Sequence, residues 1–223
     1  MSNKITISCY DVDNTIVRGY TQKYFINYLF KNRIISFKIR FLGVTWFLFY
    51  KIGLVSDLYK PMNFLLNFLK GYSIEKYNNF FDDFFQKCIV KNIYNDAILN
   101  IKKDINGGAR VILISTSLEP IIIRIAKYLN VKDVISTKIS FNNSICRGTV
   151  NGKIIDGVEK VNFLVDYIKK LGLSRDVIYT SFYSDSYRDL ALLNFVDDPH
   201  VVNPDNQLLR MAKLNNWPVV HFN

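Results

Sequence analysis

Apolar residues along the chain follow two patterns, and the first consists of short runs. Runs of β-branched and other apolar residues predict strands that are buried on both faces. They lie at residues 4–10, 110–115, 134–136, 177–183 and 200–202. Residues 139–150, with Asn142-Asn143 at the bend, predict a small hairpin.

The second pattern places apolar residues three and four positions apart, which is the spacing of one face of a helix. It predicts helices within residues 20–32, 60–70, 77–105, 118–129, 159–171, 187–194 and 204–214. Breaks are expected at residues 55–57 and 71–73, and no strand is predicted between residue 17 and Gly107-Gly108.

The order of these elements predicts the architecture. Strands alternate with helices in the second half of the chain, which is typical of a parallel sheet covered on both faces. The expected fold class is α/β, a Rossmann-like parallel sheet core with an all-helical cap inserted after the first strand. Residues 1–17 and 105–223 would form the core, and residues 18–104 the cap.

The composition of the 223-residue chain is that of a folded protein, because 49% of its residues are hydrophobic and 22% are charged. Its three cysteines are widely spaced and form no CxxC pattern, which argues against a disulfide framework or a zinc site. Reduced thiols favour a cytoplasmic location. The first residues reach an acidic cluster too soon for a signal peptide.

The net charge of +10 is unevenly distributed. Residues 18–60 contain eight Lys or Arg and one acidic residue, Asp57, which places a formal charge of +7 in this segment. Such a segment suits nucleic acid, an anionic membrane surface or an anionic substrate, and a solvated helix face is the alternative. No groove-reading or base-stacking motif accompanies the charge, so no nucleic-acid partner is expected.

Four polar groups lie where predicted strands end or where the next helix begins. They are residues 11–15 (DVDNT), residues 115–117 (STS), Lys160 after Gly157, and residues 185–189 (DSYRD). The carboxyl ends of parallel strands form the ligand-binding edge of an open α/β sheet. Each group alone could be a helix cap or a solvated loop, but together they predict one site.

The chemistry of this predicted site follows from its acids. Asp11, Asp13 and Asp185 would converge, and two carboxylates about 4 Å apart repel by roughly 4 kcal/mol at an effective dielectric constant of 20. The cluster therefore needs a cation or a shifted pKa, and oxygen ligands suit Mg²⁺ rather than zinc. A hydroxyl, a lysine and backbone N–H groups nearby would hold phosphate, which predicts phosphoryl transfer with an aspartate nucleophile.

These motifs resemble those of the haloacid dehalogenase (HAD) superfamily of phosphatases, in the branch that includes phosphoserine phosphatase (subfamily IB). The similar segments are CYDVDNT, VILISTSLEP, GVEK, YSDSYRDLALL and VVNPDNQLLRMAKLNNWPVV. They span nearly the whole predicted core. The resemblance implies a Mg²⁺-dependent phosphatase that works through an aspartyl-phosphate intermediate.

The resemblance implies a role for each acidic residue. Asp11 would be the nucleophile that accepts the phosphoryl group. Asp13 would be the general acid that protonates the leaving group and then the base that activates water. Asp185 would ligate Mg²⁺ together with Asp11 and the backbone carbonyl of Asp13. Asp189 would support the metal's waters or Lys160.

The resemblance also implies the phosphate-binding residues. Ser115 would bind phosphate together with the backbone N–H of Thr116, and Lys160 would neutralise the phosphoryl oxygens. Thr15 would help to position Asp13.

Two positions depart from the phosphoserine branch. Tyr20 stands where that branch carries a glutamate suited to an amino group, so phosphoserine is not expected to be the substrate. Arg188 stands where a small or amide residue is usual, and it would add a contact to an anion.

Residues 24–73 resemble the cap of a membrane-associated relative, phosphatidylglycerophosphatase C. The longest charge-free apolar run there, residues 41–50, has ten residues, whereas a spanning helix needs about 20. One interpretation is a helix that lies in the interface of an anionic membrane; the other is an ordinary cap whose aromatic residues form its own core. The aromatic residues concerned are Phe37, Phe41, Trp46, Phe47, Phe49 and Tyr50.

The sequence thus predicts a phosphomonoester hydrolase, cytoplasmic or peripheral on the inner face of the cell membrane. Its substrate would be a lipid phosphate such as phosphatidylglycerophosphate. The alternatives are a small soluble phosphorylated metabolite, or a phosphotransferase that uses the same nucleophile and an alcohol acceptor. A phospho-receiver domain is disfavoured because it lacks the insertion and the late acidic pair, and the intact acidic set disfavours a silent binding scaffold.

Overall fold

The computed structural model describes residues 4–51, 54–55 and 57–223 and contains one seven-stranded sheet in this part of the chain. The strand order is β4-β3-β2-β1-β5-β6-β7, and every neighbouring pair is parallel except β3 and β4. The strands are β1 (Ile5–Tyr10), β2 (Arg110–Leu118), β3 (Asp133–Asn142), β4 (Ile145–Asn151), β5 (Ile178–Ser184), β6 (Asp198–Val202) and β7 (Val219–Val220).

Helices connect these strands, and several of them follow one another between β1 and β2. The elements of this insertion are α1 (Thr21–Lys31), α2 (Phe37–Lys51), α3 (Tyr59–Leu66), η1 (Asn67–Leu69), α4 (Ile74–Phe84), η2 (Phe85–Ile89), η3 (Val90–Asn92) and α5 (Asn95–Asn106). The later elements are α6 (Glu119–Tyr128), α7 (Val158–Lys170), η4 (Arg175–Val177), η5 (Tyr187–Asp189), α8 (Leu190–Phe195) and α9 (Asn206–Asn215).

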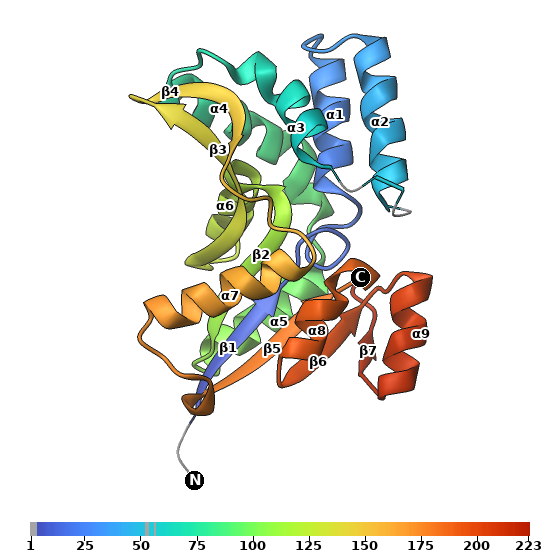
Figure 1. The fold of residues 1–223 in the computed structure, drawn as a ribbon, viewed down its shortest axis with the longest axis vertical. Helices are drawn as coiled ribbons and strands as arrows, with labels where there is room; N and C mark the ends of the chain where they lie inside the picture. Colours follow the sequence, from blue (N-terminus) through green and yellow to red (C-terminus); the bar gives the residue numbers. More distant parts are fainter. Residues whose placement is uncertain (1–3, 52–53, 56) are drawn as a thin grey trace.

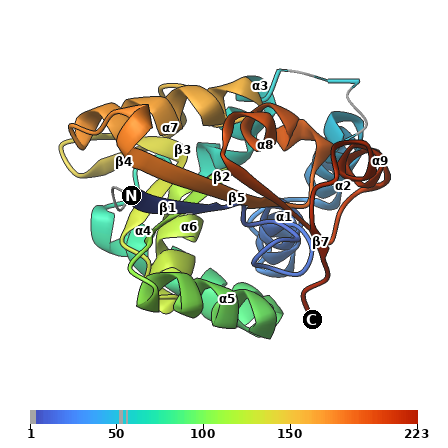
Figure 2. The same ribbon diagram turned by 90° about the horizontal axis from the view of Figure 1, so that it is seen from below.

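The sheet is buried on both faces, as its continuous apolar strands predict. Ile7 and Cys9 of β1 pack with α7, α8 and α9 on one face, whereas Tyr10 belongs to the core shared with α5 and α6 on the other. Figure 2 shows α7 and α8 on one side of the sheet and α5 and α6 on the other. The expected fold class, a mostly parallel α/β sheet with a helical cap inserted after β1, is confirmed.

The cap lies above the carboxyl ends of the strands (Figure 1), and its packed aromatic side chains belong to the same hydrophobic core as Tyr10 of β1. The ring of Phe25 on α1 lies 5.3 Å from that of Phe84 and 5.8 Å from that of Phe81, both on α4. All three side chains are buried. Aromatic pairs at such distances stabilise a core beyond the apolar area that they bury.

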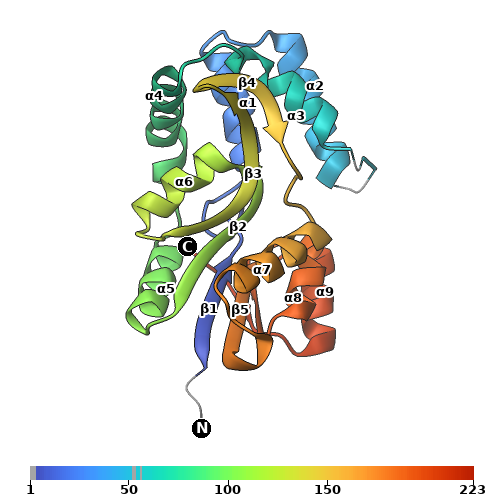
Figure 3. The ribbon, with the colours of Figure 1, turned by 60° about the vertical axis from the view of Figure 1, so that its left-hand side comes forward.

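The hairpin of β3 and β4 extends from the sheet to the cap, as Figure 3 shows. The sequence predicts a short strand at 134–136 and a separate hairpin at 139–150, but the structure has one continuous strand, β3. Asn143 and Ser144 join β3 to β4 with positive φ angles of 45° and 64°, which gives a tight two-residue turn. Gly148 of β4 lies so close to the cap that a Cβ atom there would stand 2.9 Å from the carbonyl oxygen of Leu66.

The two ends of the insertion lie side by side. Val17 and Ile93 form an antiparallel bridge. The backbone N–H of Arg18 donates to the Asn92 carbonyl at 2.7 Å, and that of Tyr94 donates to the Ile16 carbonyl at 2.9 Å. The predicted division into core and cap at residues 17 and 104 stays a prediction, and α5 lies against the sheet (Figure 2).

Most of the other expected elements agree with the structure to within a few residues at their ends. The break expected at 55–57 includes Ser56, which lies outside the described residues. Strand β7 was not expected, because two exposed valines form no recognisable pattern. The three cysteines, all in the described part of the chain, are free thiols.

Candidate active site

A small pocket lies between the cap and the carboxyl ends of the strands, with a volume of about 50 Å³. Almost every residue singled out from the sequence lines it, together with residues from the cap. The lining residues are Asp11, Asp13, Tyr20, Gln22, Phe47, Tyr50, Ser115, Thr116, Asp156, Lys160, Asp185, Ser186, Arg188 and Asp189.

Asp11 and Lys160 form a buried ion pair at the centre of the pocket. The Asp11 backbone N–H donates to the Tyr183 carbonyl at 2.9 Å, so this residue extends the pairing of β1 with β5. Lys160 Nζ lies 2.7 Å from Asp11 Oδ1 and 2.7 Å from Asp189 Oδ1, and all three side chains are buried. Gly157, with a φ of 52°, turns the chain into α7 and thereby places Lys160 in its first turn.

Burial is the main influence on the pKa of Asp11. It raises this pKa to about 7, with further increases from Asp189 and Asp13, although Lys160 opposes the shift. Burial disfavours charge on Lys160 as well, but its two acidic neighbours outweigh that effect and raise the Lys160 pKa above its ordinary value. The ammonium group therefore stays charged, while Asp11 needs more positive charge nearby to remain ionised.

Asp13 is oriented by α1 and β2. Its Oδ1 accepts a hydrogen bond from the backbone N–H of Thr21 at 2.6 Å, at the first residue of α1. Its Oδ2 accepts from Ser117 Oγ at 3.0 Å, and Gln22 Nε2 donates to the same hydroxyl at 2.7 Å. The carboxylate is thus held by the start of a helix, where negative charge is favoured.

Asp185 follows β5 and faces the same pocket from a buried position. Asn14 Nδ2 donates to Asp185 Oδ2 at 3.0 Å, which ties the loop after β1 to the loop after β5. The hydroxyl of Ser184, the last residue of β5, donates to Asp189 Oδ2 at 2.6 Å. The two acidic segments predicted to converge therefore do so.

The phosphate-binding candidates lie where β2 is irregular. The register between β2 and β3 shifts between Ser115 and Leu118, and such a bulge redirects side chains. Ser115 Oγ accepts a hydrogen bond from the Ser117 N–H at 3.1 Å, and both Ser115 and Thr116 line the pocket. Thr15 is fully buried outside the pocket lining, and its hydroxyl has no hydrogen-bond partner among the described residues.

Five acids and two bases line the pocket, which leaves a formal charge of −3. A dianionic phosphate would be repelled unless a cation reduced this charge. No group of three or more acidic, histidine or cysteine side chains suited to a metal occurs in the described part of the chain. Two carboxylates, from Asp11 and Asp185, with a backbone carbonyl and waters still provide the oxygen ligands that Mg²⁺ prefers.

The sequence did not identify several residues at the outer end of the pocket. Gln22, Phe47 and Tyr50 come from the cap, and Asp156 comes from the loop between β4 and α7. Phe47 and Tyr50 were expected at a membrane interface or in a core of the cap, and the positions of all four residues depend on contacts between distant parts of the chain. The charge of Asp156, four residues before Lys160, was the one available signal.

A family model for haloacid dehalogenase-like hydrolases matches residues 9–194. The chain therefore belongs to the haloacid dehalogenase-like hydrolase family. The prediction that it is a phosphatase of this superfamily, with phosphoserine-phosphatase-like relatives, is confirmed.

Several curated proteins are similar to nearly the whole chain, and two of them are described. A histidinol-phosphatase of Neisseria meningitidis is 26% identical over 222 residues, which cover 97% of this chain and 98% of that protein. Phosphoserine phosphatase SerB1 of Mycobacterium tuberculosis is 24% identical over 220 residues, which cover 96% of this chain and 70% of that protein.

The fold is shared by solved structures, of which two are described. A protein of unknown function from Bordetella pertussis has a TM-score of 0.89 at 20% identity, with 97% of this chain and 98% of that chain covered. A substrate-bound complex of phosphoserine phosphatase has a TM-score of 0.68 at 16% identity, with 97% and 93% covered. The cap is therefore part of a shared architecture rather than an addition peculiar to this chain.

Proposed function

We propose that this phosphatase hydrolyses the phosphomonoester of a small soluble metabolite, with Asp11 as the nucleophile. The observation that carries the proposal is the buried contact of Asp11 and Asp189 with Lys160 in a pocket at the strand ends. A carboxylate, a fixed ammonium group and a partly enclosed space together suit transfer of a phosphoryl group to Asp11.

The remaining residues have complementary tasks. Lys160 holds positive charge beside the oxygens of the group being transferred. Ser115 and the Thr116 N–H hold those oxygens from the β2 side. Asp13 delivers a proton to the leaving oxygen and then takes one from the attacking water. Its contacts with Thr21 and Ser117 fix the carboxylate in place.

Mg²⁺ fits the same pocket. The carboxylates of Asp11 and Asp185, together with the Asp13 carbonyl, would hold it, and Asp189 would support its waters or Lys160. When bound, the ion would neutralise charge on the phosphoryl oxygens and lower the repulsion among the carboxylates. The proposal is supported by the formal charge of −3 on the pocket lining.

The proposal of a small metabolite is supported by the relatives, whose names refer to histidinol phosphate and phosphoserine. Tyr20 lines the pocket and offers no carboxylate for an amino group. Histidinol phosphate and phosphoserine both carry an amino group, so Tyr20 does not rank one above the other, and both belong in the substrate panel.

A substrate panel tests this proposal. The purified chain would be assayed for phosphate release from histidinol phosphate, phosphoserine, sugar phosphates and an aryl phosphate, with Mg²⁺ or with EDTA. We expect Mg²⁺-dependent release and transfer of little phosphate to added glycerol. Transfer to glycerol as the main product would indicate a phosphotransferase, and the absence of any turnover would refute the proposal.

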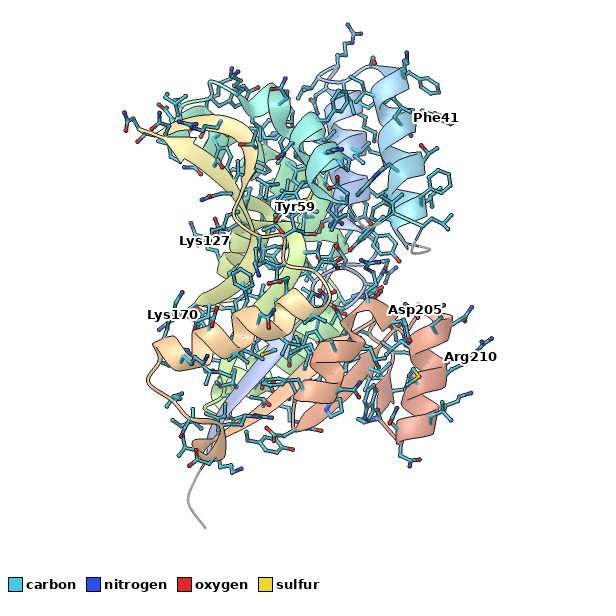
Figure 4. The ribbon with its side chains drawn as sticks, in the orientation of Figure 1. Phe41, Tyr59, Lys127, Lys170, Asp205 and Arg210 are labelled. Atoms are coloured by element: carbon cyan, nitrogen blue, oxygen red, sulfur yellow. The ribbon has the colours of Figure 1, made fainter. Side chains whose placement is uncertain are left out.

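A second candidate substrate, an amphiphilic phosphate such as a lipid phosphate, is favoured by one specific observation. A groove of about 380 Å³ between α2 and α3 is lined mainly by apolar side chains, and Gln22 and Phe47 line both this groove and the catalytic pocket. Figure 4 shows Phe41 on the outer side of α2, and this side chain is 59% exposed. An acyl tail in the groove would lie next to its phosphate in the pocket.

Membrane contact belongs to this second candidate. No helix in the described part of the chain is both long and apolar enough to cross a bilayer. Phe37 and Phe49 are exposed like Phe41, whereas Tyr50 is buried. The exposed rings and the basic residues of the segment would suit the surface of an anionic membrane, as in the predicted resemblance to phosphatidylglycerophosphatase C.

The length of the substrate's alkyl chain distinguishes the two candidate substrates. Hydrolysis of alkyl phosphates with two to twelve carbons would be compared in the wild type, in Leu42→Glu in the groove and in Leu99→Glu on α5. Both leucines are exposed, so neither change removes a buried side chain. If kcat/KM rises with chain length and only Leu42→Glu abolishes the rise, the groove binds the tail. A flat profile excludes the amphiphilic substrate.

A further inference from the structure

Three side chains from distant parts of the sequence meet at the mouth of the catalytic pocket. Arg188 Nη2 lies 2.5 Å from Asp156 Oδ2. The Tyr50 hydroxyl, from the end of α2 in the cap, donates to Asp156 Oδ1 at 2.9 Å. The guanidinium of Arg188 lies over the Tyr50 ring, 4.0 Å from its centroid. Core and cap therefore fix one arginine between them.

Arg188 keeps hydrogen-bonding capacity in this arrangement. Its Nε and Nη2 donate to Asp156 at 3.4 and 2.5 Å, and its Nη1 donates to the Tyr50 carbonyl at 3.4 Å. These bonds use three of the five N–H groups of a guanidinium. The Tyr50 side chain also interacts with the guanidinium, which leaves at least one N–H group for a ligand, and the Arg188 side chain is 30% exposed.

Asp156, by contrast, has little capacity left to accept further hydrogen bonds. It accepts from Tyr50 and Arg188, and the Thr116 hydroxyl lies 3.5 Å from its Oδ1. Burial would raise the pKa of Asp156, but the hydrogen bonds from Arg188 and Tyr50 and the positive charges of Arg188 and Lys160 together lower it. The carboxylate thus acts as a fixed counter-ion, and the pair with Arg188 carries no net charge.

The volume of the pocket determines which part of the substrate contacts Arg188. A volume of about 50 Å³ accommodates roughly three to five water molecules, at about 10–15 Å³ for each. That is close to the space of a phosphoryl group, which belongs beside Asp11 and Lys160. The leaving group of the substrate must therefore extend beyond the phosphoryl site, toward lining residues that include Arg188, Tyr20 and Phe47.

We infer that Arg188 is a specificity-determining residue, which selects phosphomonoesters whose leaving group carries a hydrogen-bond acceptor. Asp156 and the cap residue Tyr50 are positioning residues that hold its guanidinium plane. This inference rests on the proposed function, because it names the class of leaving group that the same pocket takes. Since Tyr50 belongs to the cap, the arginine is correctly placed only when the cap lies over the core.

Two substrates with the same three-carbon chain test the inference. Glycerol 1-phosphate carries two hydroxyl acceptors that propyl phosphate lacks. A hydrogen bond to a charged group contributes enough for about a 10- to 100-fold difference in binding. We expect the wild type, with Mg²⁺, to prefer glycerol 1-phosphate by about this factor in kcat/KM, mainly through KM.

Variants then assign the preference to the cluster. Arg188→Gln should reduce the preference to less than about 3-fold, and Tyr50→Phe should reduce it by a smaller factor, because only the contact with Asp156 is lost. Tyr59→Phe is the matched control: the Tyr59 hydroxyl bonds to the Gly152 carbonyl at 3.2 Å, outside the pocket. This control should keep the wild-type preference.

The outcomes separate this inference from the proposed function. If the wild type hydrolyses both substrates with equal kcat/KM, or if Arg188→Gln keeps the preference, the inference is wrong and the hydrolase stands. If the wild type hydrolyses neither substrate nor any other member of the panel, both fail. Thermal unfolding would show whether Arg188→Gln is folded; if it is not, Arg188→Lys, which loses the planar fork, and Tyr50→Phe decide the matter.

Discussion

The catalytic pocket and the cap core are both buried, but opposite kinds of side chain fill them. In the pocket, Lys160 lies between Asp11 and Asp189, and every one of these groups is ionisable. In the cap, Phe25, Phe81 and Phe84 pack ring against ring. Burying charge costs free energy that apolar packing supplies. The pocket should therefore govern activity, and the cap core should govern stability.

The largest expected effect is the loss of activity on substitution of Asp11, with stability retained. Asp11→Asn keeps the shape of the side chain but removes the nucleophile, so we expect kcat to fall by at least about 10⁴-fold. The melting temperature should stay within a few degrees of the wild type or rise, because an amide relieves buried repulsion. Stopped assays and calorimetry would measure both.

Asp166→Asn is the matched control for this prediction, since Asp166 is exposed on α7. It should retain wild-type kcat. An Asp11→Asn protein with more than a tenth of the wild-type turnover would contradict the role of Asp11.

The second-largest effect is expected in the cap core, where a substitution should lower stability rather than activity. Phe84→Ala leaves a cavity among the rings of the cap and should lower the free energy of unfolding by about 3–5 kcal/mol. Turnover at a temperature where the variant is folded should stay within a few-fold of the wild type. Urea unfolding would measure the loss, and Phe64→Ala, at a side chain that is 62% exposed, should change stability far less.

A substitution of Lys160 tests whether the pocket governs activity alone or contributes to stability as well. Lys160→Met leaves Asp11 and Asp189 without their shared cation, and breaking a buried ion pair costs about 3–5 kcal/mol. We expect this variant to lose both turnover and stability in the absence of metal. Adding Asp189→Asn should recover part of the stability and none of the activity. A Lys160→Met protein that is as stable as the wild type without metal would show that water already compensates these acids.

The smallest effect is expected at the surface of the cap. Phe41→Ser should change the free energy of unfolding by less than about 0.5 kcal/mol, because the ring is already exposed. The informative measurement is cosedimentation with anionic vesicles in the wild type and the variant. Binding that depends on Phe41 would support the amphiphilic substrate, whereas equal sedimentation with neutral and anionic vesicles would count against it.

The core of the site could be predicted from the sequence because its residues follow strands. A strand of β-branched residues such as β1 is recognisable locally, and the rules of parallel sheets then place Asp11 and Asp185 at one edge. The same local logic indicated the fold class. No side-chain contact had to be known in advance.

The outer end of the pocket could not be predicted in this way. Tyr50 meets Asp156 across 106 positions of the sequence, and Arg188 meets Tyr50 only after the cap has folded over the core. Similarly, the sequence predicts a strand at 134–136 that is separate from the hairpin at 139–150. In the structure β3 is continuous, because the hairpin packs on the cap around Gly148. Tertiary contacts override local patterns at these positions.

The antiparallel bridge between Val17 and Ile93 has a consequence for how this architecture can change. A segment that leaves and re-enters the sheet side by side at one point does not disturb the pairing of β1 with β2. A shorter or longer insertion could be joined at the same two residues, and the nucleophile loop before them would keep its register. Enzymes built on this plan can therefore exchange their substrate-facing module while the reacting groups stay in place.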